Sequence, residues 1–165
     1  MKIQRFFNVI NDHNDLQQIS EMVSVFDSKR SWHFQGSSKD SKLAFFISYL
    51  SQDELNLFSK HLHQYLVQYE PNAQFVLERA YINCNPAHVG GDWHTDGTNG
   101  ITLLYYPNTE FDFNSDGGTD FEHHGIENYI ENSIIMFPAE CSHKAVAHKI
   151  NGAYRFSVAI KLKRI

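Results

Sequence analysis

The sequence has few of the features that mark disulfide-linked, membrane or nucleic-acid-binding proteins. Its only two cysteines, Cys84 and Cys141, match no disulfide or metal-binding spacing. It contains no apolar run typical of a signal peptide or a membrane span. Fourteen basic against 19 acidic side chains give a net charge of −5, and the basic tail of residues 161–164 is too short to change that balance. We therefore expect a cytoplasmic protein without membrane or nucleic-acid partners.

The length and composition are typical of one globular domain. The chain has 165 residues, of which 42% are hydrophobic and 14% aromatic. A chain of this length can bury one core but is too short for two ordinary domains. Because no internal repeat or linker divides it, we expect residues 1–165 to form a single domain with one active centre at most.

Residues 1–70 are expected to be mainly helical and to support the rest of the domain. Ser51 precedes Glu54 by three residues, which is the pattern of a helix capping box, and Pro71 would end this helix. Apolar residues then follow with helical spacing: Leu55, Phe58, Leu62, Tyr65, Leu66 and Tyr69. An earlier group has the same spacing and precedes a polar loop at residues 35–41: Leu16, Ile19, Val23 and Phe26.

Residues 71–165 have the pattern of a β-rich domain core. Short apolar or alternating runs are separated by Gly, Asn, Asp and Pro, which favours closely spaced strands. The expected strands are residues 75–82, 101–106, 133–137, 143–150 and 154–162. The sequence therefore predicts a mainly β protein in which N-terminal helices pack on a sandwich or barrel.

A histidine and an aspartate lie two residues apart in the glycine-rich stretch GGDWHTDGTNG, residues 90–100. On a strand, residues i and i+2 point to the same side, so His94 and Asp96 can offer a nitrogen and an oxygen to one metal ion. Because the chain has ten histidines, such a pair can also arise by chance on the surface. The pair therefore needs further residues to indicate a site.

A second histidine from a distant strand would complete a metal site with three open positions. Non-haem Fe(II) oxygenases use this arrangement, in which a 2-oxo acid can fill two positions and O2 the third. The far carboxylate of that acid needs a fixed cationic partner, which Arg155 can supply. Arg155 and Ser157 share one side of the last expected strand, whose other side is apolar. The alternative is a surface arginine on an edge strand.

Ordered motifs between residues 77 and 162 strengthen the oxygenase interpretation. They read LERAYIN, WHTD, TLLYYPN, GGTDF, FPA, SHKAV and RFS. Together they resemble the Fe(II)- and 2-oxoglutarate-dependent dioxygenases, in particular the prolyl 4-hydroxylase-like branch. The resemblance implies a double-stranded β-helix, or jelly roll, buttressed by N-terminal helices. It also implies Fe(II), 2-oxoglutarate and O2, and allows ascorbate as a further cofactor.

The resemblance assigns roles to individual residues. It implies that His94 and Asp96 are the first two iron ligands and that Arg155 pairs with the 5-carboxylate of 2-oxoglutarate. Tyr106 matches a tyrosine whose hydroxyl often joins that carboxylate site, although a core aromatic residue is an equal alternative. Asn83 matches an asparagine that contacts 2-oxoglutarate in the branch that repairs alkylated nucleobases. The carboxylate of Asp96 favours a hydroxylase over the halogenating relatives, which lack it.

Four histidines follow Asp96 and could supply the third ligand: His123, His124, His143 and His148. The last two precede Asn151-Gly152, which could form a turn into the strand of Arg155. A two-residue turn would place His148 on the side of Arg155, whereas a three-residue turn would place His143 there. The motif that the family resemblance aligns also favours His143, and we select it.

The expected activity is hydroxylation of a C–H bond, with a peptidyl prolyl or similar residue as the substrate. Two alternatives are a non-enzymatic jelly-roll module that binds a small molecule and a nucleobase-repair dioxygenase, which the acidic charge disfavours. The peptide or small-molecule substrate is set by residues at the barrel mouth, which follow no code. Four polar residues could line that mouth or face solvent: His88, Asp92, His123 and His124.

Overall fold

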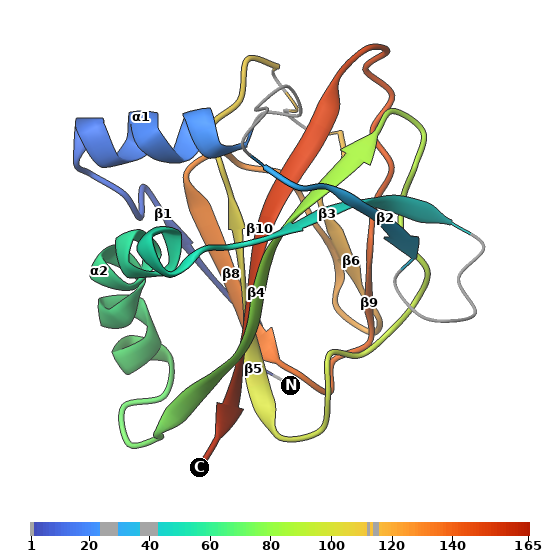
Figure 1. The fold of residues 1–165 in the computed structure, drawn as a ribbon. Helices are drawn as coiled ribbons and strands as arrows, with labels where there is room; N and C mark the ends of the chain where they lie inside the picture. Colours follow the sequence, from blue (N-terminus) through green and yellow to red (C-terminus); the bar gives the residue numbers. More distant parts are fainter. Residues whose placement is uncertain (1, 24–29, 37–42, 112, 114–115) are drawn as a thin grey trace.

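The structure is a computed structural model that describes residues 2–23, 30–36, 43–111, 113 and 116–165. Within these residues it contains two helices and two antiparallel sheets (Figure 1). The helices are α1 (His13–Met22) and α2 (Gln52–Tyr69). The strands are β1 (Gln4–Phe7), β2 (His33–Gly36), β3 (Ala44–Tyr49), β4 (Phe75–Pro86), β5 (Gly100–Tyr106), β6 (Thr119–Phe121), β7 (Gly125–Glu127), β8 (Ser133–Pro138), β9 (His143–Ala145) and β10 (Tyr154–Arg164).

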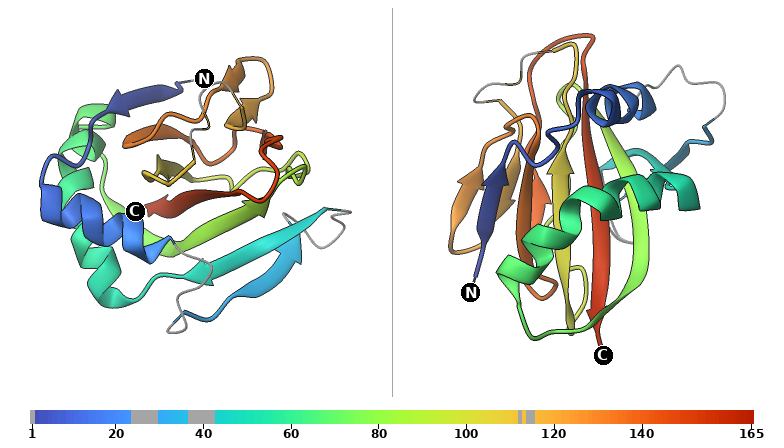
Figure 2. Two further views of the ribbon diagram at one scale, coloured as in Figure 1. Left: turned by 90° about the horizontal axis from the view of Figure 1, so that it is seen from above. Right: turned by 90° about the vertical axis from the view of Figure 1, so that its left-hand side faces the viewer.

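The two sheets face each other. The larger has seven strands in the order β1-β8-β5-β10-β4-β3-β2, and the smaller has three in the order β7-β6-β9. The helices lie on one side of the larger sheet and the smaller sheet lies on the other (Figure 2). This arrangement confirms the expected mainly β fold, a jelly roll supported by helices.

Side chains alternate between the two faces of the larger sheet, and this divides the core into two parts. On β4 and β10, Ile82, Val158 and Ile160 point toward the helices, where they pack with residues of α1 and α2. On the opposite face, Ala159 packs in a second cluster with Phe121 of the smaller sheet. Successive strand residues point to opposite faces, so the odd-numbered residues from 79 to 85 of β4 and from 155 to 161 of β10 are left to line the space between the sheets.

The start of α2 has the predicted capping box. The Ser51 hydroxyl accepts a hydrogen bond from the backbone N–H of Glu54 at 3.4 Å, and the Glu54 carboxylate accepts one from the backbone N–H of Ser51 at 2.6 Å. All six apolar residues predicted to share one face belong to the helix-side core or pack against it. The prediction for α1 is confirmed for Leu16, Ile19 and Val23, whereas Phe26 lies outside the described residues.

The expectation of a mainly helical N-terminal region is wrong in one respect. Residues 1–70 also contribute β1, β2 and β3 to the larger sheet, and β1 and β2 form its two edges. Gln35 and Gly36, expected in a loop, end β2, and the rest of that loop up to residue 41 lies outside the described residues. These strands have four to six residues each, too short for a clear alternation in the sequence.

The predicted hairpin before Arg155 is also wrong. β9 ends at Ala145 and pairs with β6, whereas β10 pairs with β4 and β5. The backbone after β9 bonds to loops instead, since Val146 N–H donates to the carbonyl of Gly118 at 3.1 Å. Ala153 N–H donates to the carbonyl of Ile150 at 3.2 Å, so the turn has two central residues and not the three that we expected.

Neither described helix is long and apolar enough to cross a membrane.

Candidate active site

A cavity of about 110 Å³ lies between the two sheets. The larger sheet lines it with the odd-numbered residues from 79 to 85 of β4 and from 155 to 161 of β10, and with Thr102 and Leu104 of β5. The smaller sheet contributes Thr119 of β6 and residues of β9, and the loop before β5 contributes residues 94–96. Strands far apart in sequence therefore deliver polar side chains to one cavity.

Three potential metal ligands meet in this cavity. Each of His94, Asp96 and His143 offers a ligand atom, and these atoms lie within 4.8 Å of one another. Nε2 of His94 lies 3.7 Å from Oδ1 of Asp96, and Nε2 of His143 lies 3.7 Å from Oδ2. A backbone bridge between His94 and His143 holds the two histidines side by side. Two imidazoles and one carboxylate form the donor set of the facial triad.

Hydrogen bonds fix which nitrogen of each histidine can bind a metal. Nδ1 of His94 lies 2.9 Å from the carbonyl oxygen of Asp92, and Nδ1 of His143 lies 3.0 Å from that of Cys141. Because a carbonyl oxygen can only accept, each Nδ1 must carry the proton. Each Nε2 therefore presents its lone pair toward Asp96, as a metal ligand requires.

Two side chains hold the Asp96 carboxylate in place. Thr102 Oγ1 donates to Oδ2 at 2.5 Å, and Lys161 Nζ donates to Oδ1. Burial alone would raise the pKa of Asp96, but the Lys161 ammonium and these hydrogen bonds hold that pKa below its ordinary value. Asp96 is therefore a carboxylate at neutral pH and is fixed before any metal binds.

Burial of His143 predicts a pH-dependent stability for the metal-free protein. Burial lowers the pKa of His143 to about 4. Below the ordinary histidine pKa of about 6.5, His143 binds a proton in the unfolded chain but not in the folded chain. The free energy of unfolding should therefore fall as the pH drops from about 6.5 toward 4. The pKa of His148 is also lowered, chiefly by burial, which acts in the same direction.

Urea unfolding of chelator-treated protein measures this effect. We expect the free energy of unfolding to be lower at about pH 5 than at about pH 7, by on the order of 2 kcal/mol. The variant His143→Gln should show a smaller difference. Equal stability of the wild type at both pH values would contradict a buried neutral His143.

Arg155 lies at the other end of β10 and is fully buried. It donates from Nη2 to the carbonyl of Gly118 at 2.6 Å and from Nη1 to Oδ1 of Asn85 at 3.3 Å. Its guanidinium carbon lies 5.5 Å from the ring centre of Tyr106. Nε of Arg155 and Nδ2 of Asn85 are buried without a hydrogen-bond partner among the described residues. Such unpaired donors are costly, so their presence beside the cavity fits a missing anionic acceptor.

The structure places the other predicted cosubstrate residues at different depths. Asn83 and Ser157 both line the cavity, and Asn83 Nδ2 donates to Ser157 Oγ at 3.3 Å. Tyr106 is buried behind the lining, where its hydroxyl lies 2.7 Å from Oγ1 of Thr119. Tyr106 therefore adjoins the site through Thr119, which does line it.

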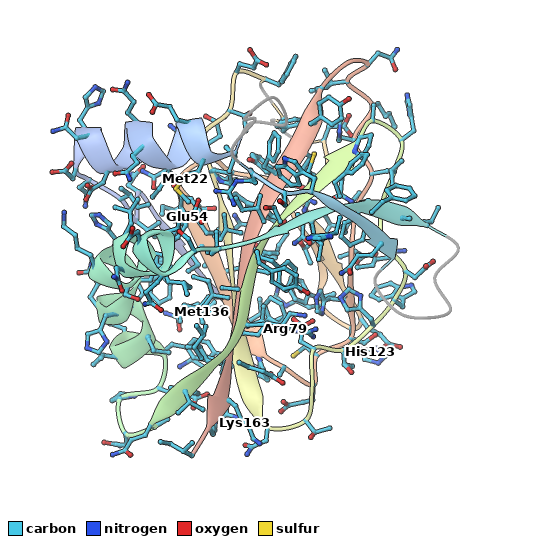
Figure 3. All side chains as sticks on the ribbon, viewed as in Figure 1. Met22, Glu54, Arg79, His123, Met136 and Lys163 are labelled. Carbon is cyan, nitrogen blue, oxygen red and sulfur yellow. The ribbon has the colours of Figure 1, made fainter. Side chains whose placement is uncertain are left out.

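The four polar residues considered for the mouth do not line the cavity. His124 lies 2.9 Å from a carboxylate oxygen of Glu127, and the His123 side chain is exposed to solvent (Figure 3). His88 lies 3.0 Å from Oδ1 of Asn151. Asp92 acts through its backbone carbonyl, which fixes His94.

Several residues of the site were not anticipated. Lys161, considered part of a basic tail, is buried in the cavity wall against Asp96. Lys161 lies on the same side of the strand as Arg155 and Ser157, and the spacing in the sequence could have indicated this. Asn85, two residues after Asn83, is the asparagine that contacts Arg155. Thr102 carried no signal, because a threonine in an apolar strand is common.

Comparisons with known proteins identify the fold. No protein-family model and no curated protein matches this sequence. Among solved structures, a 2OG-Fe(II) oxygenase family member from Burkholderia pseudomallei is similar with a TM-score of 0.74 and 13% identity, over 98% of this chain and 84% of the other. A collagen prolyl hydroxylase of Paramecium bursaria Chlorella virus-1, in complex with 2OG, has a TM-score of 0.71 and 11% identity, with coverage of 100% and 97%.

A third similar structure has a different activity. The epimerase SnoN from nogalamycin biosynthesis, in complex with Fe3+, alpha ketoglutarate and nogalamycin RO, has a TM-score of 0.71 and 11% identity. The match covers 98% of this chain and 78% of that one. The chain thus has the double-stranded β-helix fold of the 2OG-Fe(II) oxygenases.

Proposed function

We propose that this protein is an Fe(II)- and 2-oxoglutarate-dependent dioxygenase that hydroxylates a C–H bond. The observation that carries the proposal is the meeting of His94, Asp96 and His143 within 4.8 Å, inside a cavity that Arg155 also lines. The fold supports it, since the similar structures include members of the 2OG-Fe(II) oxygenase family. The triad supplies three ligands and leaves the remaining metal positions for cosubstrate and O2.

Each residue of the site has a separate task in this proposal. Fe(II), when bound, supplies the coupling of O2 reduction to the oxidative decarboxylation of 2-oxoglutarate. Nε2 of His94, Nε2 of His143 and the Asp96 carboxylate would hold the metal. Arg155 would bind and orient the far carboxylate of 2-oxoglutarate, with the free Nδ2 of Asn85 as a further donor. The enclosing sheets would limit the access of water to the reacting groups.

The solved structures that are similar to this chain suggest two kinds of substrate. Prolyl hydroxylases are among them, which favours the narrower proposal that the substrate is a peptidyl prolyl or similar residue. The SnoN structure holds a small molecule, so the same fold also acts on such compounds. A nucleobase in DNA or RNA is disfavoured because the chain has a net charge of −5.

A proline-rich peptide tests the narrower proposal directly. The protein is incubated with Fe(II), 2-oxoglutarate, O2 and the peptide, and the peptide is weighed by mass spectrometry. A gain of one oxygen is expected if a prolyl residue is the substrate. An unchanged peptide together with succinate formation would contradict the prolyl substrate and retain the dioxygenase.

The hydrogen bond from Thr102 to Asp96 predicts a role in metal affinity. The change Thr102→Val keeps the shape of the side chain but removes the donor that fixes Oδ2. We expect Fe(II) affinity to fall about tenfold, which is typical when a partner of a metal ligand is lost. Thr119→Val is the matched control, because this buried threonine lines the cavity but bonds to Tyr106. Equal losses in both variants, measured by anaerobic calorimetry, would argue against this role.

A further inference from the structure

The wall that β4 and β10 form carries cations at both of its ends. Paired residues of the two strands face the cavity in four steps: Asn85 with Arg155, Asn83 with Ser157, Tyr81 with Ala159, and Arg79 with Lys161. Arg155 and Lys161 are six residues apart, which corresponds to about 20 Å along an extended strand. The cationic groups are therefore divided between two places, one at Arg155 and one at the pair of Arg79 and Lys161.

In the residues that the structure describes, the two positive charges of Arg79 and Lys161 are balanced by only one carboxylate, that of Asp96. Like charges placed directly opposite each other on a sheet are unfavourable unless an anion lies between or beside them. Lys161 bonds to Asp96, which also has to serve as a metal ligand. Arg79 lies over the ring of Tyr81, at 5.9 Å, and forms no ion pair with any carboxylate in the described part of the chain.

The net charge of the cavity lining also favours the binding of an anion. Among the described residues that line it, three cations stand against the single carboxylate of Asp96, which leaves a net charge of +2. Bound Fe(II) and 2-oxoglutarate would cancel each other, so this excess would remain. A positive cavity in a chain of net charge −5 is a local feature that attracts anions to this one place.

We propose that the substrate, whether a peptide or a small molecule, carries a carboxylate or phosphate group that binds between Arg79 and Lys161. This proposal rests on the dioxygenase function and adds the substrate class to it. Lys161 Nζ has three N–H donors, of which Asp96 uses one, and the guanidinium of Arg79 can bind a carboxylate or phosphate through two parallel hydrogen bonds. Arg79 is exposed and lies beside β4 on the side of the smaller sheet, where the anionic group of an entering substrate would meet it (Figure 3).

The cosubstrate occupies the other cationic place in this proposal. Arg155 is fully buried, and within the described part of the chain neither its Nε nor Nδ2 of Asn85 beside it has a hydrogen-bond partner. A 2-oxoglutarate molecule that reaches from the triad to Arg155 leaves Arg79 free. The cosubstrate and the anionic group of the substrate would therefore bind on different sides of the metal, which allows their binding to be measured separately.

Matched charged and neutral probes test the proposal. Oxygen-free protein loaded with Fe(II) and saturated with 2-oxoglutarate is titrated with the capped amino acid N-acetylglutamate amide and with N-acetylglutamine amide, which differ in one charge. Capped phosphoserine and capped serine form the phosphate arm. In at least one arm the charged probe should bind tenfold or more tightly than its neutral partner, which corresponds to about 1.4 kcal/mol, and the tighter arm identifies the anionic group.

Two variants locate the binding site. Arg79→Gln should remove the preference for the charged probe and leave the affinity for 2-oxoglutarate unchanged. Lys163→Gln makes the same charge change on the neighbouring strand β10, the strand of Lys161, but outside the cavity lining, and should alter neither. Both positions are exposed, so folding should be unaffected.

Three results would overturn the proposal. The first is equal binding of the charged and neutral probes in both the carboxylate and the phosphate comparison. The second is an Arg79→Gln variant that still prefers the charged probe. The third is an Arg79→Gln variant in which the affinity for 2-oxoglutarate falls instead. A protein that fails to load Fe(II) and 2-oxoglutarate would contradict the dioxygenase function itself. Successful loading without a charge preference would contradict only the substrate class.

Discussion

Replacement of His143 by alanine is expected to abolish Fe(II) binding and 2-oxoglutarate turnover. Its Nε2 faces Asp96 and would be the third ligand of the proposed triad, and its Nδ1 proton is held by the carbonyl of Cys141. The site then keeps only His94 and Asp96, and two ligands cannot fill the three positions of one octahedral face. Anaerobic calorimetry with Fe(II) and an assay of succinate would measure the two effects.

His148→Ala is the matched control for this experiment. His148 is as buried as His143, but its Nε2 lies 3.2 Å from the carbonyl oxygen of Asn85 and its ring packs against Phe113. The substitution should therefore lower stability and leave Fe(II) binding and turnover largely intact. Loss of Fe(II) in His148→Ala and its retention in His143→Ala would show that the triad is assigned wrongly.

Arg155→Ala is expected to weaken 2-oxoglutarate binding by at least about tenfold, or 1.4 kcal/mol, while Fe(II) still binds. A buried carboxylate that loses a guanidinium partner remains unpaired, which is costly in a cavity shielded from water. Arg155→Lys should recover part of the affinity, because lysine restores the charge but not the planar pair of donors. Titration of the Fe(II)-loaded protein with 2-oxoglutarate under nitrogen would provide both values.

The control for Arg155 is Arg164→Ala on the same strand. Arg164 pairs with Glu70 at 2.6 Å and lies outside the cavity lining, so its loss should not change 2-oxoglutarate affinity. Because Arg155 also bonds to Gly118, thermal unfolding must confirm that Arg155→Ala is folded. An unchanged 2-oxoglutarate affinity in folded Arg155→Ala would remove Arg155 from the site.

The residues of the proposed site could be predicted where several short motifs occurred in order. His94 and Asp96 are two residues apart in the sequence, and the structure brings His143 to them as the prediction requires. The reason given for His143 from the turn was nevertheless wrong, because β9 pairs with β6 and no hairpin leads into β10. The choice of His143 as the proposed third ligand therefore depends on the family motif around it and not on the turn geometry.

The parts that could not be predicted depend on long-range pairing. β1 and β3 are recognisable as strands only through their partners β8 and β4, which lie far along the chain. Lys161 reaches Asp96 because β10 passes beside β5, so Lys161 stands opposite Thr102, the other partner of that carboxylate. The alternation of residues along the strand indicates which side of the sheet Lys161 faces. It does not indicate that the Asp96 carboxylate lies on that side.

Succinate formation tests the dioxygenase proposal most directly. Purified protein is incubated with 2-oxoglutarate, and Fe(II) and O2 are each included or omitted. The proposal predicts succinate above background only when both are present, and none in His143→Ala. Protein that binds Fe(II) and 2-oxoglutarate but forms no succinate with O2 would contradict the proposal, and would indicate a jelly-roll module that binds small molecules without turnover.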